Sequence, residues 1–348
     1  MFILVIVYRS SLSDCCSGVI ILISMQDLRV LVLRGGPSDE YAVSMKTGAA
    51  VLDSLRRQNY FTKDVVVTKQ GEWLEEGRVR APEHILQAID VVFIGMHGAY
   101  AEDGEVQKIF ERDRIPFTGS RSLPSAIAFN KSLTKETLKP YGILTPEYRL
   151  ISADDLEELA LIIDEIKSAF GPEYILKPVA NGSSVGTRII SADDPLLEIL
   201  ESYFAKNPDD SVLIEEHIAG KEATCAVLED FRGQDLYIFP TVELAIPNTC
   251  AFYDNEAKYG GETEIICPSR FSLSEREQIT EASALAHEKL GLSQYSRSDF
   301  ILKDGQAYFL EVNTLPGMTA TSLFPRASEA VGLDFDHLVS HLVKTASY

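Results

Sequence analysis

Between residues 28 and 95 the chain alternates apolar strands with an amphipathic helix, an order that few architectures accommodate. The apolar run 28–33 ends in a pair of glycines, and apolar residues then recur at helical spacing after a cap at Ser38 or Asp39. A second apolar run, 91–95, is continuous enough to be buried on both faces of a sheet. This order predicts an α/β domain with a Rossmann-like parallel sheet and with ligands at the ends of its strands.

The whole chain is long enough for two or three domains. It has 348 residues, of which 45% are hydrophobic and 24% charged, as in globular proteins and unlike fibrous or disordered ones. Composition and the expected elements divide it into four parts: residues 1–24, 25–119, 120–215 and 216–348.

The first part, residues 1–24, does not resemble the rest of the chain. Its two apolar runs are too short for a transmembrane helix. A secretory signal requires basic residues before its apolar stretch, and no Lys or Arg precedes Arg9. Met25 opens a segment that reads as the first strand of a domain. We expect residues 1–24 to be an over-extended start with initiation at Met25, or else an unusual disordered tail, and we expect no membrane association.

The charge balance restricts the partners. Lys and Arg number 32 against 52 Asp and Glu, so the net charge is −20 and the chain repels phosphate backbones. We therefore expect no nucleic-acid partner, and any bound nucleotide needs a local cationic site or metal ions. The five cysteines are scattered, with no Cys-x-x-Cys pair, which favours a reducing, cytoplasmic compartment.

A hairpin near the C-terminus carries a candidate metal site. Two apolar strands flank Asp304-Gly305, and Glu311 and Asn313 share one face of the second strand. A three-residue loop with Gly305 in the left-handed conformation would place Asp299 opposite Glu311, giving three hard oxygen ligands of the kind Mg²⁺ needs. A two-residue loop would turn Asp299 to the other face, and solvated strand carboxylates are the alternative interpretation.

Other segments carry weaker signals. The loop 177–186 is rich in small and hydroxyl residues that suit a phosphate or carboxylate, although such loops are usually flexible turns. The aromatic and charged segment 251–259 has the length of a lid, and backbone N–H groups of the turn-rich loop 314–322 suit an oxyanion. His97 follows a strand end, where a lone histidine is usually structural. Serine-hydrolase, zinc and Walker A motifs are missing from the sequence.

The order of these motifs carries more information than any one of them. Arg34-Gly-Gly-Pro-Ser-Asp-Glu40, His97-Gly, Lys177-Pro…Gly186, Glu256-Ala-Lys-Tyr259, Arg297-Ser-Asp299 and Glu311-Val-Asn-Thr-Leu-Pro-Gly follow one another along the chain. From Met25 to its end the sequence resembles the D-alanine–D-alanine ligase family of the ATP-grasp superfamily.

The resemblance implies an enzyme that joins two D-alanines through a D-alanyl phosphate, for peptidoglycan precursor synthesis. It implies a Rossmann-like substrate domain (25–119) followed by a two-subdomain α+β ATP-grasp part (120–215 and 216–348), with ATP between the subdomains. It further implies two Mg²⁺ or Mn²⁺ ions and a homodimer formed through the N-terminal domains.

The resemblance also assigns roles to individual residues. The metal ligands would be Asp299, Glu311 and Asn313. The nucleotide would be held by Lys131, Lys177, Ser184, Glu215, Glu222 and Lys258. The substrates would be held by Glu40, His97, Ser183, Arg297, Ser322 and Leu323. The catalytic set would be Glu40, Ser183, Tyr259, Arg297, Gly317 and Ser322.

Three other interpretations are weighed against this one. Another ATP-grasp ligase would make a different dipeptide or depsipeptide, but Tyr259 is typical of the peptide-forming members. A non-catalytic nucleotide-binding protein would not need the full set of charged motif residues. A plain dinucleotide-binding module would need a Gly-x-Gly-x-x-Gly after Leu33, which the sequence lacks.

Overall fold

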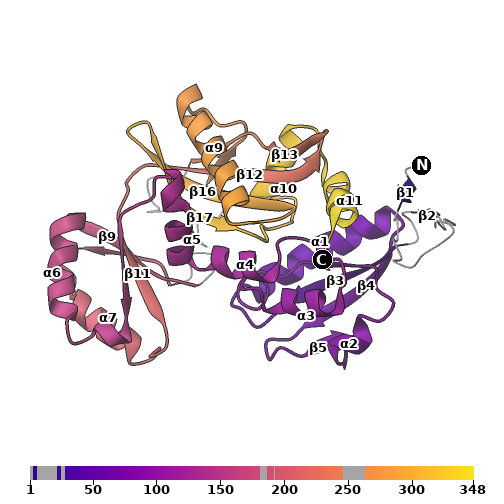
Figure 1. Ribbon diagram of the computed structural model, residues 1–348, viewed down its shortest axis with the longest axis horizontal. Coiled ribbons are helices and arrows are strands. Elements are labelled where there is room, and N and C mark those ends of the chain that lie inside the picture. The colour runs from indigo at the N-terminus through magenta and orange to yellow at the C-terminus, as the bar shows by residue number, and fades with distance from the viewer. Residues whose placement is uncertain (1–2, 6–21, 25–27, 181–185, 192, 246–262) are drawn as a thin grey trace, which may run out of the picture.

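The computed structural model describes residues 3–5, 22–24, 28–180, 186–191, 193–245 and 263–348. Besides a two-stranded pair near the N-terminus, three sheets follow one another across the molecule in Figure 1, with the N-terminal sheet at one end and the four-stranded sheet, called here the smallest sheet, at the other. Strands β1 (Ile3–Val5) and β2 (Leu22–Ser24) pair only with each other within these residues.

The N-terminal sheet has the order β6-β5-β4-β3-β7. Its strands are β3 (Arg29–Gly35), β4 (Phe61–Val67), β5 (Trp73–Glu75), β6 (Arg78–Val79) and β7 (Val91–Ile94). Its helices are α1 (Tyr41–Arg57), α2 (Pro82–Ile85) and α3 (Glu105–Asp113). Strand β3 runs parallel to both β4 and β7, so the predicted parallel α/β sheet is confirmed for these three strands, whereas β5 and β6 extend the sheet in antiparallel pairs.

The predicted helix cap at Ser38 or Asp39 is wrong. Helix α1 begins at Tyr41 after Glu40, and no side chain caps it. The Ser38 hydroxyl instead donates a hydrogen bond of 2.7 Å to the carbonyl oxygen of His97. The turn after β3 is therefore tied to the loop after β7, which brings Glu40 and His97 to the same end of the sheet.

Two helices lead from this sheet to the smallest one. These are α4 (Ser122–Phe129) and α5 (Lys131–Leu138), followed by the 3₁₀ turn η2 (Lys139–Tyr141). The smallest sheet is antiparallel in the order β10-β9-β11-β8. Its strands are β8 (Tyr148–Ser152), β9 (Glu173–Pro178), β10 (Arg188–Ser191) and β11 (Ser211–Glu216). The 3₁₀ turn η3 (Ala153–Asp155) leads into α6 (Leu159–Phe170), which with α7 (Leu196–Phe204) buries a separate apolar cluster against this sheet.

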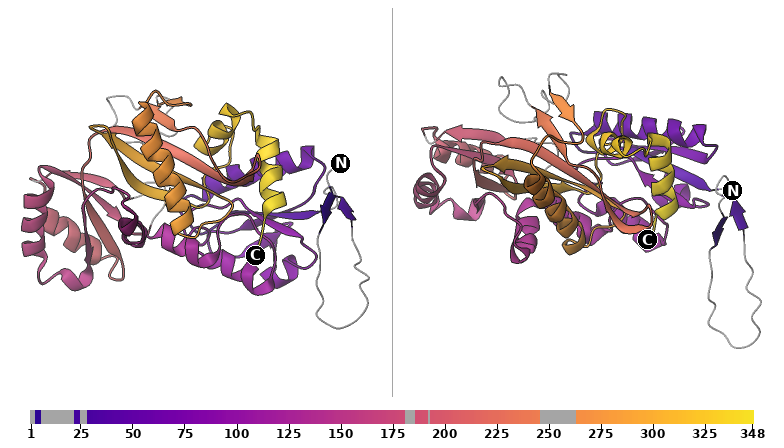
Figure 2. Two further views of the ribbon diagram at one scale, coloured as in Figure 1. Left: turned by 45° about the horizontal axis from the view of Figure 1, so that its top comes forward. Right: turned by 90° about the horizontal axis from the view of Figure 1, so that it is seen from above.

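The third sheet has the order β15-β14-β12-β16-β17, with β13 also paired to β12. Its strands are β12 (Lys221–Phe231), β13 (Gln234–Ile238), β14 (Val242–Ala245), β15 (Glu264–Ile266), β16 (Tyr295–Lys303) and β17 (Gln306–Asn313). Helices α9 (Leu273–Lys289) and α10 (Leu323–Ala330) pack on this sheet, whereas α11 (Phe335–Thr345) packs against α10, α1 and β7. Figure 2 shows α9 lying along one face of this sheet.

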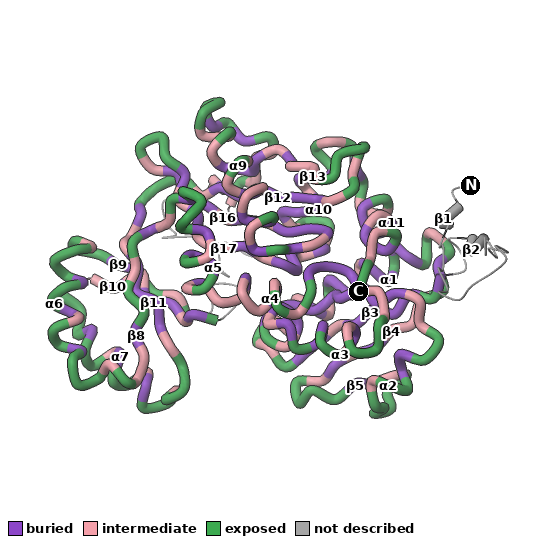
Figure 3. Tube along the Cα trace, in the orientation of Figure 1, coloured by how far each residue is buried: buried purple, intermediate pink, exposed green. Residues whose placement is uncertain are grey.

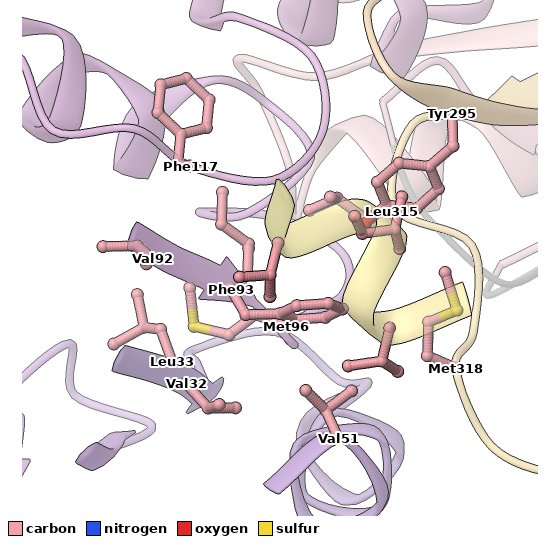
Figure 4. Packing of buried hydrophobic residues seen from close by; sticks show 14 of the residues in the cluster. Val32, Leu33, Val51, Val92, Phe93, Met96, Phe117, Tyr295, Leu315 and Met318 are labelled. Atoms are coloured by element: carbon pink, nitrogen blue, oxygen red, sulfur yellow. The ribbon is translucent and has the colours of Figure 1, made fainter. Parts of the chain in front are cut away.

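The largest hydrophobic core joins the N-terminal sheet to the C-terminal part of the chain. Figure 4 shows Phe93 and Met96, from β7 and the loop after it, beside Leu315 and Met318 from the segment after β17. Tyr295, at the start of β16, is 1% exposed in the same cluster. In Figure 3, buried residues occur along β3 as well as along β12, β16 and β17. This shared core fixes the strand ends of the first sheet against the third.

Replacing Phe93 with Ala tests this core. Phe93 has no exposed surface, so we expect the free energy of unfolding to fall by about 3–5 kcal/mol through lost burial and an unfilled cavity. Urea denaturation measures the change. The control is Leu123→Ala, whose side chain is 69% exposed and whose effect we expect to stay within about 0.5 kcal/mol. A Phe93→Ala loss as small as the control's would contradict the shared core.

Candidate active site

Two cavities meet over one face of the third sheet. The smaller, about 310 Å³, lies between the smallest sheet and the third sheet, and the larger, about 680 Å³, lies between the third sheet and the N-terminal sheet. Three residues line both cavities: Arg297, Glu311 and Leu323. A group held in one cavity therefore has direct access to a group held in the other.

The β16–β17 hairpin brings Asp299 opposite Glu311, although its loop is not the three-residue one from which that pairing was derived. Lys303 pairs with Gln306, so the loop has two residues, Asp304 and Gly305, both with positive φ as a type I′ turn requires. The loop is thus the two-residue alternative, and the prediction that such a loop would turn Asp299 to the other face is wrong. The register shifts between Asp299 and Phe300, where β17 carries one extra residue, and this bulge restores the pairing of Asp299 with Glu311.

The candidate metal ligands form one polar cluster. The guanidinium of Arg297 donates two hydrogen bonds, of 2.9 and 2.8 Å, to the Asp299 carboxylate. Asp299 also accepts a 2.6 Å hydrogen bond from the Thr224 hydroxyl and a 3.0 Å hydrogen bond from the Asn313 amide. Glu311 lies 3.2 Å from Nζ of Lys131. Cations and neutral donors thus already hold both carboxylates in place.

The chemistry of this donor set fits Mg²⁺. Two carboxylates and an amide offer hard oxygen atoms, and the few protein ligands leave coordination positions for water and phosphate oxygens. Within the described residues no cluster of three or more His, Cys, Asp and Glu side chains is placed to bind a metal. The trio at the hairpin contains only two such residues, because its third member is Asn313.

A buried ion cluster forms one wall of the smaller cavity. Glu215, on β11, lies 2.6 Å from Nζ of Lys177 on β9 and 2.8 Å from Nζ of Lys135 on α5. Burial opposes ionisation of Glu215, but the two ammonium groups lower its pKa below the ordinary value. The nucleotide-binding candidates Lys131, Lys177, Glu215 and Glu222 all line this cavity.

His97 is held from several sides at the wall of the larger cavity. Its Nε2 lies 2.8 Å from the Thr47 hydroxyl, its Nδ1 lies 2.9 Å from the carbonyl oxygen of Leu315, and Glu102 is 3.8 Å away. Burial opposes protonation of the ring, but Glu102 and Glu40 raise the pKa of His97 above its ordinary value. His97 is therefore held in one orientation at the cavity wall by contacts with the protein on both ring nitrogens.

Close packing brings Glu40 to this wall. A Cβ on Gly98 would lie 2.8 Å from Cβ of Ser38 and 3.1 Å from a carboxylate oxygen of Glu40, and its φ is +73°. Only glycine fits both constraints without strain. The His97-Gly98 pair thus allows the turn before α1 to approach the cavity.

The segment from Gly317 to Leu323 closes the other side of the larger cavity. The Ser322 hydroxyl lies 2.8 Å from the Thr319 hydroxyl and accepts a 3.1 Å hydrogen bond from the Thr319 N–H. Ser322 immediately precedes α10, so the Leu323 N–H lies at a helix N-terminus, where anions are favoured. Gly317 packs close to Ser322, because a Cβ there would lie 2.9 Å from the Ser322 hydroxyl.

Most of the expected site residues therefore line one of the two cavities. Glu40, His97, Asn313, Gly317 and Ser322 line the larger one, and Asp299 lines the smaller one. Four expected site residues lie outside the described residues: Ser183, Ser184, Lys258 and Tyr259. The sequence analysis gave no role to Lys135, Thr224 or Glu102, and only Lys135 had a usable signal, because it follows Lys131 by one helical turn.

Known families and proteins are similar to most of this chain. The family model of the D-Ala–D-Ala ligase C-terminus matches residues 137–344, and that of the N-terminus matches residues 75–120. The D-alanine–D-alanine ligase of Geobacter sulfurreducens is 37% identical over 325 residues, covering 92% of this chain and 95% of the relative. That of Desulforamulus reducens is 38% identical over 323 residues, covering 92% and 98%.

Solved structures are similar throughout. The VanG D-Ala:D-Ser ligase from Enterococcus faecalis has a TM-score of 0.76 and 28% identity, covering 91% of this chain and 98% of its own. The Bacillus anthracis D-alanine–D-alanine ligase complexed with ATP has a TM-score of 0.70 and 28% identity, covering 91% and 97%. The protein is thus an ATP-dependent ligase of the ATP-grasp fold. Within that class, the chain belongs to the D-alanine–D-alanine ligase family.

Proposed function

We propose that the protein uses ATP to join two D-alanines into D-alanyl-D-alanine through a D-alanyl phosphate. The observation that carries this proposal is that Arg297 and Glu311 line both cavities. A nucleotide in the smaller cavity and an amino acid in the larger one would react where these two residues stand. The family and the ATP-bound relative support the assignment of the smaller cavity to ATP.

The proposed reaction has two transfers. A carboxylate oxygen of the first D-alanine attacks the γ-phosphorus of ATP, and the bond to ADP breaks. The amine of the second D-alanine then attacks the acyl carbon, loses a proton, and phosphate leaves with the electron pair of the broken C–O bond. Both steps depend mainly on positioning and charge neutralisation. Arg297, Lys131 and Lys177 supply positive charge from the chain, and Asp299, Glu311 and Asn313 would hold two Mg²⁺ or Mn²⁺ ions that neutralise phosphate charge.

The walls of the larger cavity suit the amino acids. Glu40 would pair with the ammonium of the first D-alanine, beside His97. Ser322 and the Leu323 N–H would hold the carboxylate of the second D-alanine. Arg297 and the Gly317 N–H would stabilise the oxyanion that forms as the amine attacks.

Four further roles are proposed from the resemblance alone. Ser184 and Lys258 would contact the nucleotide, and Ser183 and Tyr259 would join Glu40 in closing the site.

The parts 25–119, 120–215 and 216–348 would act as substrate domain and two nucleotide-clamping subdomains, in a homodimer. We also propose a cytoplasmic location for peptidoglycan precursor synthesis. No helix in the described ranges has both the length and the apolar character needed to cross a bilayer.

The test is ADP release by the full chain with Mg²⁺ and ATP, comparing D-alanine, L-alanine, and D-alanine with D-lactate. We expect release that depends on D-alanine, with D-alanyl-D-alanine identified by mass. A folded, ATP-binding preparation that gives no turnover with D-alanine would contradict the proposal.

The acceptor needs a separate test, because one structural relative is a D-Ala:D-Ser ligase. Equal D-alanine and D-serine are supplied together, and the two dipeptides are separated by mass. We expect D-alanyl-D-alanine to dominate. A predominance of D-alanyl-D-serine would assign the protein to the other specificity.

A further inference from the structure

Lys135 stands behind the wall of the smaller cavity. Its side chain is 1% exposed, and Glu215, its partner at 2.8 Å, is 2% exposed. Glu215 and Lys177 are among the described residues that line the cavity, whereas Lys135 is not among them. Lys135 therefore touches a lining carboxylate from the protein side.

Helix α5 connects both walls of this cavity. Lys131 and Lys135 are one helical turn apart and project from the same side of α5. Lys131 contacts Glu311 on β17, and Lys135 contacts Glu215 on β11. Figure 1 shows α5 standing between the smallest sheet and the third sheet. One rigid helical turn thus fixes one carboxylate of each sheet.

A second buried ammonium on Glu215 is more than stability requires. One lysine already neutralises the carboxylate, and taking another charge out of water is costly. The burial lowers the pKa of Lys135 to about 8, even though Glu215 favours its charged form. A buried lysine with this desolvation cost, next to a ligand cavity, indicates that ligand binding in the cavity requires it.

Glu215 keeps acceptor capacity after these contacts. A carboxylate has about four lone-pair sites. Oε1 of Glu215 is buried 2.8 Å from Nζ of Lys135, whereas Oε2 lies 2.6 Å from Nζ of Lys177, which lines the cavity. A donor in the cavity can therefore bind a further lone pair of Oε2, provided that the orientation of the carboxylate is fixed.

We propose that Lys135 is a positioning residue that holds the Glu215 carboxylate ready to accept the exocyclic amine of adenine. The inference rests on the proposed function, since it takes the smaller cavity as the ATP site. The purine of ITP carries a carbonyl in place of this amine, so its oxygen would face the Glu215 carboxylate, and two acceptors repel each other. Lys135 thereby contributes to selection of ATP over ITP.

The experiment compares Kd for ATP and for ITP, measured by calorimetry with Mg²⁺ and without D-alanine. In Lys135→Met we expect ATP binding to weaken about 10- to 100-fold, because a charged hydrogen-bond acceptor loses its orientation. ITP binding should change less than about threefold, so the preference for ATP collapses. The control is Lys139→Met, an exposed lysine one turn further along, which should alter neither constant.

Each other outcome is decisive. Equal weakening of ATP and ITP would show that Lys135 only supports packing, and unchanged binding of both would show that it has no role; either result overturns the proposal. If the wild-type chain binds neither nucleotide, the proposed function fails instead. Melting curves of both variants establish that they fold.

A pH profile provides a second readout. The groups that face Lys135 are Glu215 on β11, Lys177 on β9, Lys131 on α5 and the Tyr148 ring on β8. Since the pKa of Lys135 is about 8, wild-type affinity for ATP should fall between pH 7 and pH 9 as the ammonium loses its proton. Lys135→Met should lack this fall. A fall of the same size in both proteins would contradict the proposal.

Discussion

Replacing Arg297 with Met should lower kcat about 10²- to 10³-fold, the usual effect of removing one donor from an oxyanion. Arg297 is the only cation among the described residues that lines both cavities. Its two hydrogen bonds to Asp299 fix the orientation of the guanidinium at the place where the two cavities meet. Positive charge fixed there favours the transition state, in which negative charge develops, more than either bound substrate.

The loss of Arg297 should affect kcat more than KM. Because Arg297 acts mainly on the developing charge, KM for D-alanine should change less than about tenfold while kcat carries the loss. Steady-state ADP release measures both. The control is Arg270→Met, which removes an Arg–carboxylate pair with Glu243 in the same sheet but outside both cavities. A loss confined to KM would remove Arg297 from the chemical step.

The control also separates chemistry from folding. Arg270 is 61% exposed, so its loss should leave kcat within about twofold of the wild-type value. Comparable Tm values for the two variants would place the effect of Arg297 in the reaction. A Tm drop confined to Arg297→Met, with kcat recovered at lower temperature, would instead assign it a structural role.

The hairpin shows both how far sequence reasoning reaches and where it stops. Alternation along a strand correctly places Glu311 and Asn313 on one face, and turn residues correctly locate the loop. The sequence left the loop length open, and a two-residue loop places Asp299 opposite Glu311 only because of an unforeseen bulge between the pairings of Asp299 and Phe300. A bulge leaves no mark in local propensity, because it depends on how both strands pack.

Contacts between distant segments were the other limit. Thr224 donates a hydrogen bond to Asp299, 75 positions away in the sequence, and nothing in the sequence around either residue predicts this contact. Lys135 is different, since its one-turn spacing from Lys131 was visible, but its burial against Glu215 was not. Local pattern predicts elements and faces; which faces meet depends on the tertiary fold.

Glu311→Gln should weaken the binding of Mg²⁺ and lower kcat. Glu311 lines both cavities and faces Asp299 across the hairpin, so it would help to hold the metal ions that neutralise phosphate charge where the two cavities meet. Replacing the charged oxygen with an amide should raise the half-saturating Mg²⁺ concentration more than tenfold. At saturating Mg²⁺, kcat should remain about 10²- to 10³-fold low, as several kcal/mol of charge stabilisation are lost.

The same hairpin supplies the matched control. Asp304→Asn removes a carboxylate from the exposed turn at its far end, where Asn also tolerates the positive φ. This variant should follow the wild-type Mg²⁺ curve. Direct binding of Mn²⁺ by electron paramagnetic resonance, with ADP present, tests the ligand role apart from turnover. If Glu311→Gln lost activity yet bound Mn²⁺ as tightly as Asp304→Asn, Glu311 would act through its contact with Lys131, and the hairpin would hold its metal by Asp299 and Asn313.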